Sequence, residues 1–502
     1  MDWTEGYTSD IEYQAGFFRE QSPVYLNFAC VLNGFEPLPI DQPFNYFELG
    51  FGRGFTVNLL AASNPHGRFF ATDFNPAQVA GAQQLADMAE LDNLTLLESS
   101  FADLADGKAG PLPQFDFITL NGIYTWVSAE NRSHIVAFIA RYLKPGGMVY
   151  VGYNAMPGWA AALPLQRLIV EHTERQAGGS PAKLGATRQL LGRLDEVQAG
   201  YLSANPSLRP RLASLHQESP HYLAHEYMHR AWEPLYHQDV ARDLAAAKLN
   251  YIASGHLPYA FPHLSLSAAQ CSFLDDIADP ALRETLKDYL LNTSFRKDIF
   301  VKGARRMSPA RQRAWLRQTG VALTVRRADV VLPPQWSSLP AGAQGSLLDA
   351  LAKRPHGLAE LLELSGLDWP ALTESVALLI GSGQACPYFL SGEQTAPKPA
   401  QRMNRAVATQ ARDNDDYQGL AAPLLGNGIS AGLVQRLVYL ALCRRQGEID
   451  AVATTREVWA CLKAQGIGDA DQAEDAAIAA LALTVQAIIR DRVPIWRQLL
   501  VL

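Results

Sequence analysis

The stretch FELGFGRGF at residues 47–55 places three glycines at every second position, directly after an apolar run. A strand that turns sharply and brings its backbone against a ligand needs this composition, because glycine adopts conformations closed to other residues and carries no side chain. Gly50, Gly52 and Gly54 are therefore the first candidate ligand-binding residues. The surrounding sequence indicates which ligand the turn holds.

Short apolar runs alternate with helical patterns on both sides of this turn. The strand patterns lie at 45–50, 67–73, 94–100, 115–121 and 148–154, and the clearest helical patterns between them lie at 55–63 and 76–91. Such alternation is typical of a doubly wound parallel sheet. We therefore expect an α/β fold built on a Rossmann-like sheet.

The glycine spacing argues against a dinucleotide. A dinucleotide-binding turn has its third glycine three positions after the second, and Phe55 stands at that position here. One acidic residue, Glu48, precedes the turn. A second, Asp73, ends the next predicted strand, 23 residues after Gly50. Asp73 is placed to accept hydrogen bonds from both ribose hydroxyls, and the helix that starts after the turn favours an anion at its N-terminus. In S-adenosylmethionine, which has no phosphate, that anion would be the methionine carboxylate.

The motifs resemble, in order and spacing, those of the class I S-adenosylmethionine methyltransferases. They are FELGFGRG, ATDFNP, ESSFADL, FDFITLNGIYTWV, LKPGG and YVGYNAMPGW, between residues 47 and 159. NGIYTWV and YNAMPGW resemble a bacterial subgroup with a methyltransferase regulatory domain, which includes lysine methyltransferases of outer membrane proteins. The resemblance covers residues 1 to about 305, with HYLAHEYM and NTSFRKDIFVKG in the regulatory portion.

This resemblance implies S-adenosylmethionine as the cofactor. With the acid before the turn and the end of the fourth strand included, the expected cofactor-binding residues are Glu48, Gly50, Gly52, Gly54, Asp73, Phe74, Ser100, Phe101 and Asn121. Two of them depart from the family pattern. Ser100 stands where many class I enzymes have an adenine-binding aspartate, and Asn121 stands where the subgroup has histidine.

The catalytic candidates lie at the ends of the fourth and fifth predicted strands. Methyl transfer from a sulfonium is an in-line displacement, so the protein must hold the acceptor about 3 Å from the methyl and exclude water. The residues nearest this point are Tyr124, Trp126, Tyr153 and Asn154. A lysine acceptor must lose a proton of pKa near about 10.4, and an apolar aromatic slot favours the neutral amine. The alternative is that these aromatic side chains only cap the sheet.

Three parts are predicted along the chain. Residues 1–305 form the methyltransferase domain, with its core at 40–160 and a helical insert or regulatory region at 160–305. Residues 306–395 show three short helical patterns and a strand, which is the order of a winged helix, and residues 396–502 are expected to be helical. The three helices and the strand of the winged-helix-like part carry more acidic than basic residues, which favours protein docking over DNA binding.

The motif HEYMH at 225–229 has the H-E-x-x-H spacing of zinc proteases. No third ligand stands at a recognisable distance from it, and methyltransferase motifs lie on both sides. We therefore expect no metal, and we interpret the segment as a helix surface that lies over the cleft.

Composition limits the partners. A net charge of −7 and a pI of about 5.9 argue against a nucleic-acid partner. The longest apolar run is interrupted by Thr484 and Gln486, so no membrane insertion is expected, and five scattered cysteines without a CxxC pair fit a reducing cytoplasm.

The leading hypothesis is a protein lysine N-methyltransferase that acts on a protein or peptide substrate. Two alternatives stay open: a small-molecule or cell-envelope sugar methyltransferase, and a non-catalytic regulatory protein that binds the cofactor.

Overall fold

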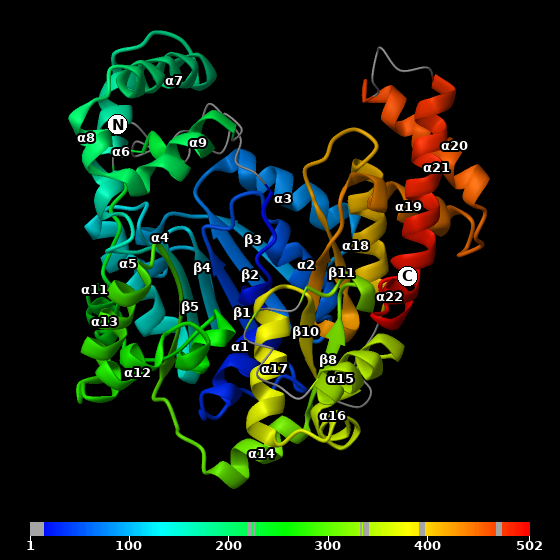
Figure 1. Ribbon diagram of the computed structural model, residues 1–502, viewed down its shortest axis with the longest axis horizontal. Helices are drawn as coiled ribbons and strands as arrows, with labels where there is room; N and C mark the ends of the chain where they lie inside the picture. The colour runs from blue at the N-terminus through cyan, green and yellow to red at the C-terminus, as the bar shows by residue number, and fades with distance from the viewer. Residues whose placement is uncertain are drawn as a thin grey trace.

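A central seven-stranded sheet, with helices on both faces, organises the methyltransferase part of the protein (Figure 1). The computed structural model describes residues 15–217, 223, 226–229, 231–331, 334, 341–390, 397–467 and 474–502. The strands are β1 Asn45–Leu49, β2 Arg68–Asp73, β3 Leu94–Glu98, β4 Phe115–Asn121, β5 Leu143–Asn154, β6 Leu249–Ser254 and β7 Phe295–Lys302. Their order is β3-β2-β1-β4-β5-β7-β6, and β7 runs antiparallel to both of its neighbours. The predicted α/β fold and Rossmann-like sheet are thus confirmed.

The strand order reverses direction at β1. Tyr46 in β1 pairs with Phe69 of β2 on one side and with Phe117 of β4 on the other. A crevice forms at the carboxyl edge of a parallel sheet at such a switch point, and ligands of open α/β proteins bind there. The glycine turn follows β1 at this edge, and Asn121 ends β4 beside it.

Alternate side chains along the strands supply two cores, because neighbouring residues in a strand point to opposite faces of the sheet. Phe47 packs with Phe138 of helix α5 (Ala129–Tyr142) on one face. Tyr46 packs on the other face, in the same core as helix α1 (Pro23–Leu32). The remaining helices of this part are α2 Phe55–Ser63, α3 Pro76–Met88 and α4 Phe101–Asp106.

A helical insert follows β5, as expected. Its described helices are α6 Leu163–Glu174, α7 Ser180–Glu196, α8 Gly200–Ala204 and α9 Arg209–Gln217, and they share a small core with Trp159. The chain then returns to the sheet through α11 His237–Ala245, β6, α12 Ala268–Asp275, α13 Pro280–Leu291 and β7. Figure 1 shows α6 to α9 on one side of the sheet and α19 to α21 on the other, both rising beyond it.

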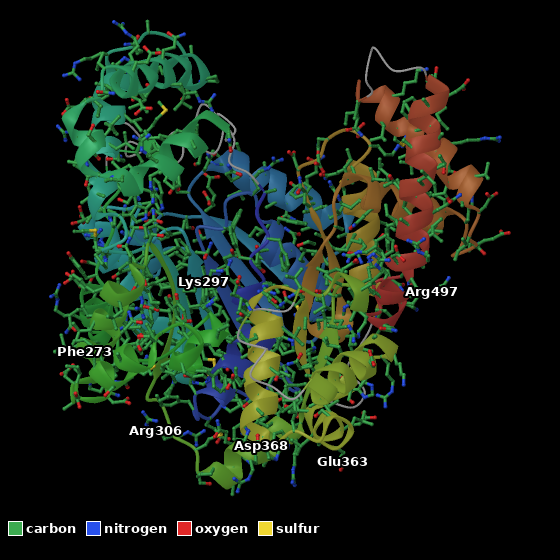
Figure 2. The ribbon with its side chains drawn as sticks, viewed as in Figure 1. Phe273, Lys297, Arg306, Glu363, Asp368 and Arg497 are labelled. Atoms are coloured by element: carbon green, nitrogen blue, oxygen red, sulfur yellow. The ribbon has the colours of Figure 1, made fainter. Side chains whose placement is uncertain are left out.

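The winged-helix-like part contains the expected helices α15 Ala341–Lys353, α16 Leu358–Ser365 and α17 Trp369–Gly381 and the expected strand β10 Ala385–Phe389. It also contains α14 Pro309–Arg317, β8 Thr319–Leu323 and the short β9 His356–Gly357, which join β10 in an antiparallel sheet of order β10-β8-β9. Figure 2 shows the acidic residues Glu363 and Asp368 at the lower edge of this part.

The C-terminal part departs from the all-helical expectation. Its helices are α18 Pro397–Gln410, α19 Leu433–Arg444, α20 Ala451–Ala464, α21 Glu474–Asp491 and α22 Val493–Gln498. Strands β11 Gly419–Ala422 and β12 Asn427–Ser430 form an antiparallel hairpin between α18 and α19, so the helical prediction is wrong there. Pro423 and Gly426, whose φ is +54°, make the turn of the hairpin. Among the described residues, no helix is both long enough and apolar enough to cross a membrane.

Candidate active site

A cavity of about 900 Å³ lies at the carboxyl edge of the sheet, at the switch point between β1 and β4. Its wall is contributed by the N-terminal segment 15–18, the glycine turn, the ends of β2, β3, β4 and β5, the start of α4, residues of the segment 226–231, and Phe295 at the start of β7. The predicted site residues that line it are Glu48, Gly50, Gly52, Asp73, Phe74, Ser100, Phe101, Asn121, Trp126 and Asn154. The structure therefore brings most of the predicted site together.

The glycine turn and Asp73 form one hydrogen-bonded unit. Gly52 donates its backbone N–H to Oδ2 of Asp73 at 2.9 Å, and Asn75 donates its own to Oδ1 at 3.0 Å. Asp73 keeps 8% of its surface exposed and lines the cavity. Burial raises the pKa of Asp73 to about 6, although the backbone N–H groups of Asn75 and Gly52 lower it in part.

The three glycines of the turn have positive φ angles, +67°, +56° and +67°, which favour glycine. A Cβ atom at Gly50 would lie 2.5 Å from Cδ1 of Ile123, and one at Gly54 would lie 2.5 Å from Cβ of Ala82. A Cβ atom at Gly52 would meet no described atom within 4 Å and would point into open space. Gly54, which does not line the cavity, is thus needed for packing, whereas Gly52 leaves room for a ligand.

Glu48 is a buried carboxyl group that faces the same cavity. Its Oε1 accepts a hydrogen bond from Nε2 of Gln21 at 3.3 Å, while Oε2 has no hydrogen-bond partner among the described residues. Burial, with a smaller contribution from the nearby Asp73 carboxylate, raises the pKa of Glu48 to about 8. The site therefore holds a protonated or unpaired carboxyl that a hydrogen-bonding or cationic ligand group would satisfy.

The hydroxyl of Ser100 has a structural task. It accepts a hydrogen bond from the backbone N–H of Asp103 at 3.1 Å, which caps α4, and donates one to Oδ2 of Asp103 at 2.8 Å. Glu98 and Asp103 also line this end of the cavity, and sequence reasoning missed both. Glu98 lies two positions before Ser100 and Asp103 lies two positions after Phe101, and this closeness to the predicted pair is the signal that could have indicated them.

Asn154, which ends β5, and Trp126, which follows β4, line the cavity across β1 from Asp73. Nδ2 of Asn154 is buried and has no hydrogen-bond partner among the described residues, although the side chain lines the cavity. Oδ1 of Asn121 accepts a hydrogen bond from the hydroxyl of Tyr150 at 3.0 Å. Asn121 is thus fixed in place, whereas Asn154 has an amide donor left for a ligand.

Tyr124 and Tyr153 are not among the residues that line the cavity, and this corrects the expectation that they face an acceptor. Both side chains are fully buried. The Tyr124 hydroxyl donates to Oδ2 of Asp243 at 3.1 Å, and the Tyr153 hydroxyl donates to Oδ2 of Asp298 at 2.7 Å. Tyr153 points away from the cavity because alternate residues of β5 face opposite sides, so its neighbour Asn154 reaches the cavity instead.

Asp298 belongs to a buried ionic cluster behind the cavity wall. It pairs with Arg296 at 2.9 Å and with His237 at 2.9 Å. The Arg296 guanidinium also pairs with Asp288 at 2.7 Å and with Glu284 at 3.1 Å. These contacts fix β7 against α13 and against the end of β5.

Two residues of the HEYMH motif line the cavity. Glu226 is half-buried, and burial raises its pKa to about 7, with Arg211 acting in the opposite direction. His229 is buried, its Nδ1 accepts a hydrogen bond from the N–H of Ala231 at 3.1 Å, and its ring lies 5.9 Å from that of Trp126. This agrees with a segment that lies over the cleft.

His225, the first residue of the H-E-x-x-H motif, lies outside the described residues. Within the described ranges, no group of three His, Cys, Asp or Glu residues is arranged to hold a metal ion.

A sheet of this order, with a glycine turn after β1 and an acid at the end of β2, defines a class I methyltransferase. The family described as a methyltransferase domain matches residues 47–149, and the family described as a predicted methyltransferase regulatory domain matches residues 219–302. The protein sll1526 of Synechocystis sp. is 35% identical over 477 residues, which cover 93% of this chain and 92% of that protein. The chain belongs to the S-adenosylmethionine-dependent methyltransferases that carry this regulatory domain.

A protein similar in sequence and one similar in structure come from Rickettsia. The protein RP028 of Rickettsia prowazekii is 24% identical over 220 residues, 44% of this chain and 86% of that protein. The structure of PKMT2 from Rickettsia typhi superposes with a TM-score of 0.69 at 18% identity, over 95% of this chain and 97% of that one. A second structure shows PKMT2 in complex with AdoHcy. At this level of identity the likeness shows a shared fold.

Proposed function

We propose that the cavity holds S-adenosylmethionine along its β1–β2 side and that a protein lysine side chain enters from the side of Asn154, Trp126 and Glu226. The proposal rests on the observation that Asp73 and Glu226 line the same cavity. The Asp73 carboxylate can accept hydrogen bonds from ribose hydroxyls. The Glu226 carboxylate can take up the proton that the amine loses. When bound, the cofactor supplies an electrophilic methyl group on a sulfonium.

The cofactor side has three matching groups. Asp73 would accept hydrogen bonds from ribose hydroxyls, since its carboxylate faces the cavity and each of its oxygens has a further lone pair. Glu48 would bind the methionine ammonium through its unpaired Oε2. Gly52 leaves the space in which the cofactor would approach the backbone.

The charge of the cavity wall favours a cationic acceptor. Among the described residues that line it, the carboxyl groups are Glu48, Asp73, Glu98, Asp103 and Glu226, and the guanidinium is that of Arg53. Arg53 is paired with Asp416 at 2.8 Å, so its charge is largely balanced. A negatively charged cleft attracts both a sulfonium cofactor and a lysine ammonium.

The acceptor side can take up the proton that lysine must lose. A general base is most effective when its pKa lies near the working pH, and burial places the pKa of Glu226 at about 7. The side-chain carbonyl of Asn154 can orient the amine by accepting one of its hydrogens. Trp126 and Phe295 line the same wall and exclude water from the amine.

A large substrate fits the rest of the chain. Trp126, which lines the cavity, packs against the core of the insert helices, and the resemblance of NGIYTWV and YNAMPGW to lysine methyltransferases supports a protein acceptor. A small-molecule acceptor remains the competing hypothesis, and the absence of a nucleic-acid partner and the cytoplasmic location stay predictions.

Incubation of the full chain with methyl-labelled S-adenosylmethionine and bacterial extract tests the proposal. We expect label in protein, and mass spectrometry of tryptic peptides should find it on lysine. Glu226→Gln should lower the rate at least about tenfold, whereas Glu196→Gln, at an exposed position of α7, should not change it. Label found only in small molecules would contradict a protein substrate, and no transfer at all would contradict an enzyme.

A further inference from the structure

The glycine turn contacts a segment more than 360 residues further along the chain. Arg53, the residue between Gly52 and Gly54, donates from Nη2 to Oδ2 of Asp416 at 2.8 Å. Its guanidinium carbon lies 5.3 Å from the ring centre of Tyr417. Arg53 lines the cavity, so this contact reaches the cofactor side of the site directly.

The same C-terminal segment packs against the helix that starts after the turn. The ring centres of Phe55, the first residue of α2, and Tyr417 are 5.1 Å apart. Both rings are buried in one cluster with Met403 of α18. A Cβ atom at Gly419 would lie 3.3 Å from the Phe55 ring, which shows how closely the two chain segments approach.

Two adjacent aspartates, Asp415 and Asp416, connect this segment to two different parts of the chain. Asp416 binds Arg53 of the turn, whereas Asp415 binds Arg436 of α19, whose side chain is fully buried. The loop between α18 and β11 therefore joins the core of the C-terminal part to the cofactor turn.

We propose that Asp416 and Tyr417 are positioning residues for S-adenosylmethionine, so that the C-terminal part sets cofactor affinity. Glycines at three alternate positions make a flexible turn. Ordering such a turn when the ligand binds costs conformational entropy and therefore weakens binding. Asp416 and Tyr417 hold Arg53 and Phe55 on either side of Gly54, and thus keep the turn ordered before the ligand arrives. The inference rests on the proposal that the cavity binds the cofactor.

Calorimetric titration of the full chain with S-adenosylhomocysteine tests the inference. Asp416→Asn should weaken binding about fivefold and leave the melting temperature within about 2 °C of the wild type. Tyr417→Leu should weaken binding similarly, whereas Tyr417→Phe, which keeps the ring, should restore it. Asp413→Asn, at an exposed position of the same loop, should bind like the wild type.

A double-mutant cycle shows whether Asp416 acts through the turn. In an Arg53→Gln background, Asp416→Asn should have no further effect on the dissociation constant. An undiminished effect in that background, or wild-type affinity in both Asp416→Asn and Tyr417→Leu, would overturn the inference. Failure of the wild-type chain to bind S-adenosylhomocysteine would instead contradict the cofactor proposal on which it rests.

Discussion

Gly52 and Asp73 are joined by a hydrogen bond of 2.9 Å from backbone N–H to Oδ2 across the ends of β1 and β2. The residue that leaves room for a ligand and the carboxylate that would bind it are thus held in one unit. Asp73 therefore cannot change position without moving the turn.

Cofactor affinity should depend on the ionisation of Asp73. The pKa of Asp73 is raised to about 6, so the carboxylate is protonated at lower pH and loses acceptor capacity. The dissociation constant for S-adenosylhomocysteine should therefore rise up to about tenfold when the pH falls from about 7 to about 5. Asp73→Asn should bind weakly with little change over this range, measured by calorimetry. An equally steep profile in the variant would assign the titration to another group.

Glu48 should destabilise the ligand-free protein at neutral and alkaline pH. Its pKa is about 8 in the folded chain, above the value of about 4.3 for an exposed glutamate, so folding is disfavoured increasingly as pH rises between these values. Glu48→Gln should raise the free energy of unfolding by more than about 1 kcal/mol at pH 7.5 and by less at pH 5. Urea titrations at both pH values measure this difference. A larger gain at the lower pH would contradict the buried, protonated carboxyl.

The glycines of the turn should separate binding from folding. Gly52→Ala meets no neighbouring atom and carries only the strain of an alanine at a φ of +56°, so the chain should fold with a modest loss of stability, but cofactor binding should fall at least about tenfold because the methyl group enters the ligand space. Gly54→Ala places a methyl 2.5 Å from Cβ of Ala82 and should lower the melting temperature. Thermal melts and calorimetry of the two variants compare these effects. Retained affinity in a folded Gly52→Ala would show that the turn does not contact the ligand.

Asn154 and Tyr153 should behave differently although they are neighbours in β5. Asn154→Ala should lower kcat at least about tenfold with cofactor affinity nearly unchanged, because its amide faces the acceptor side of the cavity. Tyr153→Phe should leave kcat within about threefold and reduce stability by about 1–3 kcal/mol, since it removes a hydrogen bond to the buried Asp298. Steady-state kinetics and urea melts of both variants test this. If Tyr153→Phe lowered kcat by more than about threefold, Tyr153 would have to act on the acceptor.

Local patterns were sufficient to predict the sheet and most of the residues that line the cavity near β1 and β2. The glycine turn and Asp73 lie within one strand-helix-strand unit, so their spacing along the chain determines their spacing in the structure. Tyr153 and Asn154 were both expected at the acceptor site, but neighbouring residues of β5 face opposite sides of the sheet, so only Asn154 lines the cavity. The hairpin of β11 and β12 was not predicted, because its segment contains Ala and Leu residues, which also favour helices.

Contacts between distant segments could not be predicted from one sequence. Glu226 was noticed only through a zinc-like spacing, and the fold was needed to bring its carboxyl to the cavity that Asp73 also lines. The ion pair between Arg53 and Asp416 joins residues 363 positions apart, and both residue types are common on exposed surfaces. Only the packing of α18 against α2 and α3 makes that pair part of the site.

A crystal structure of the full chain with S-adenosylhomocysteine would show where the cofactor binds. We expect the ribose hydroxyls to bind Asp73, the methionine part to lie along the glycine turn beside Glu48, and the sulfur to face Asn154, Trp126 and Glu226. Density for the ligand outside this cavity, or inside it with the sulfur turned away from Asn154, would rule out this binding mode and the acceptor side proposed with it.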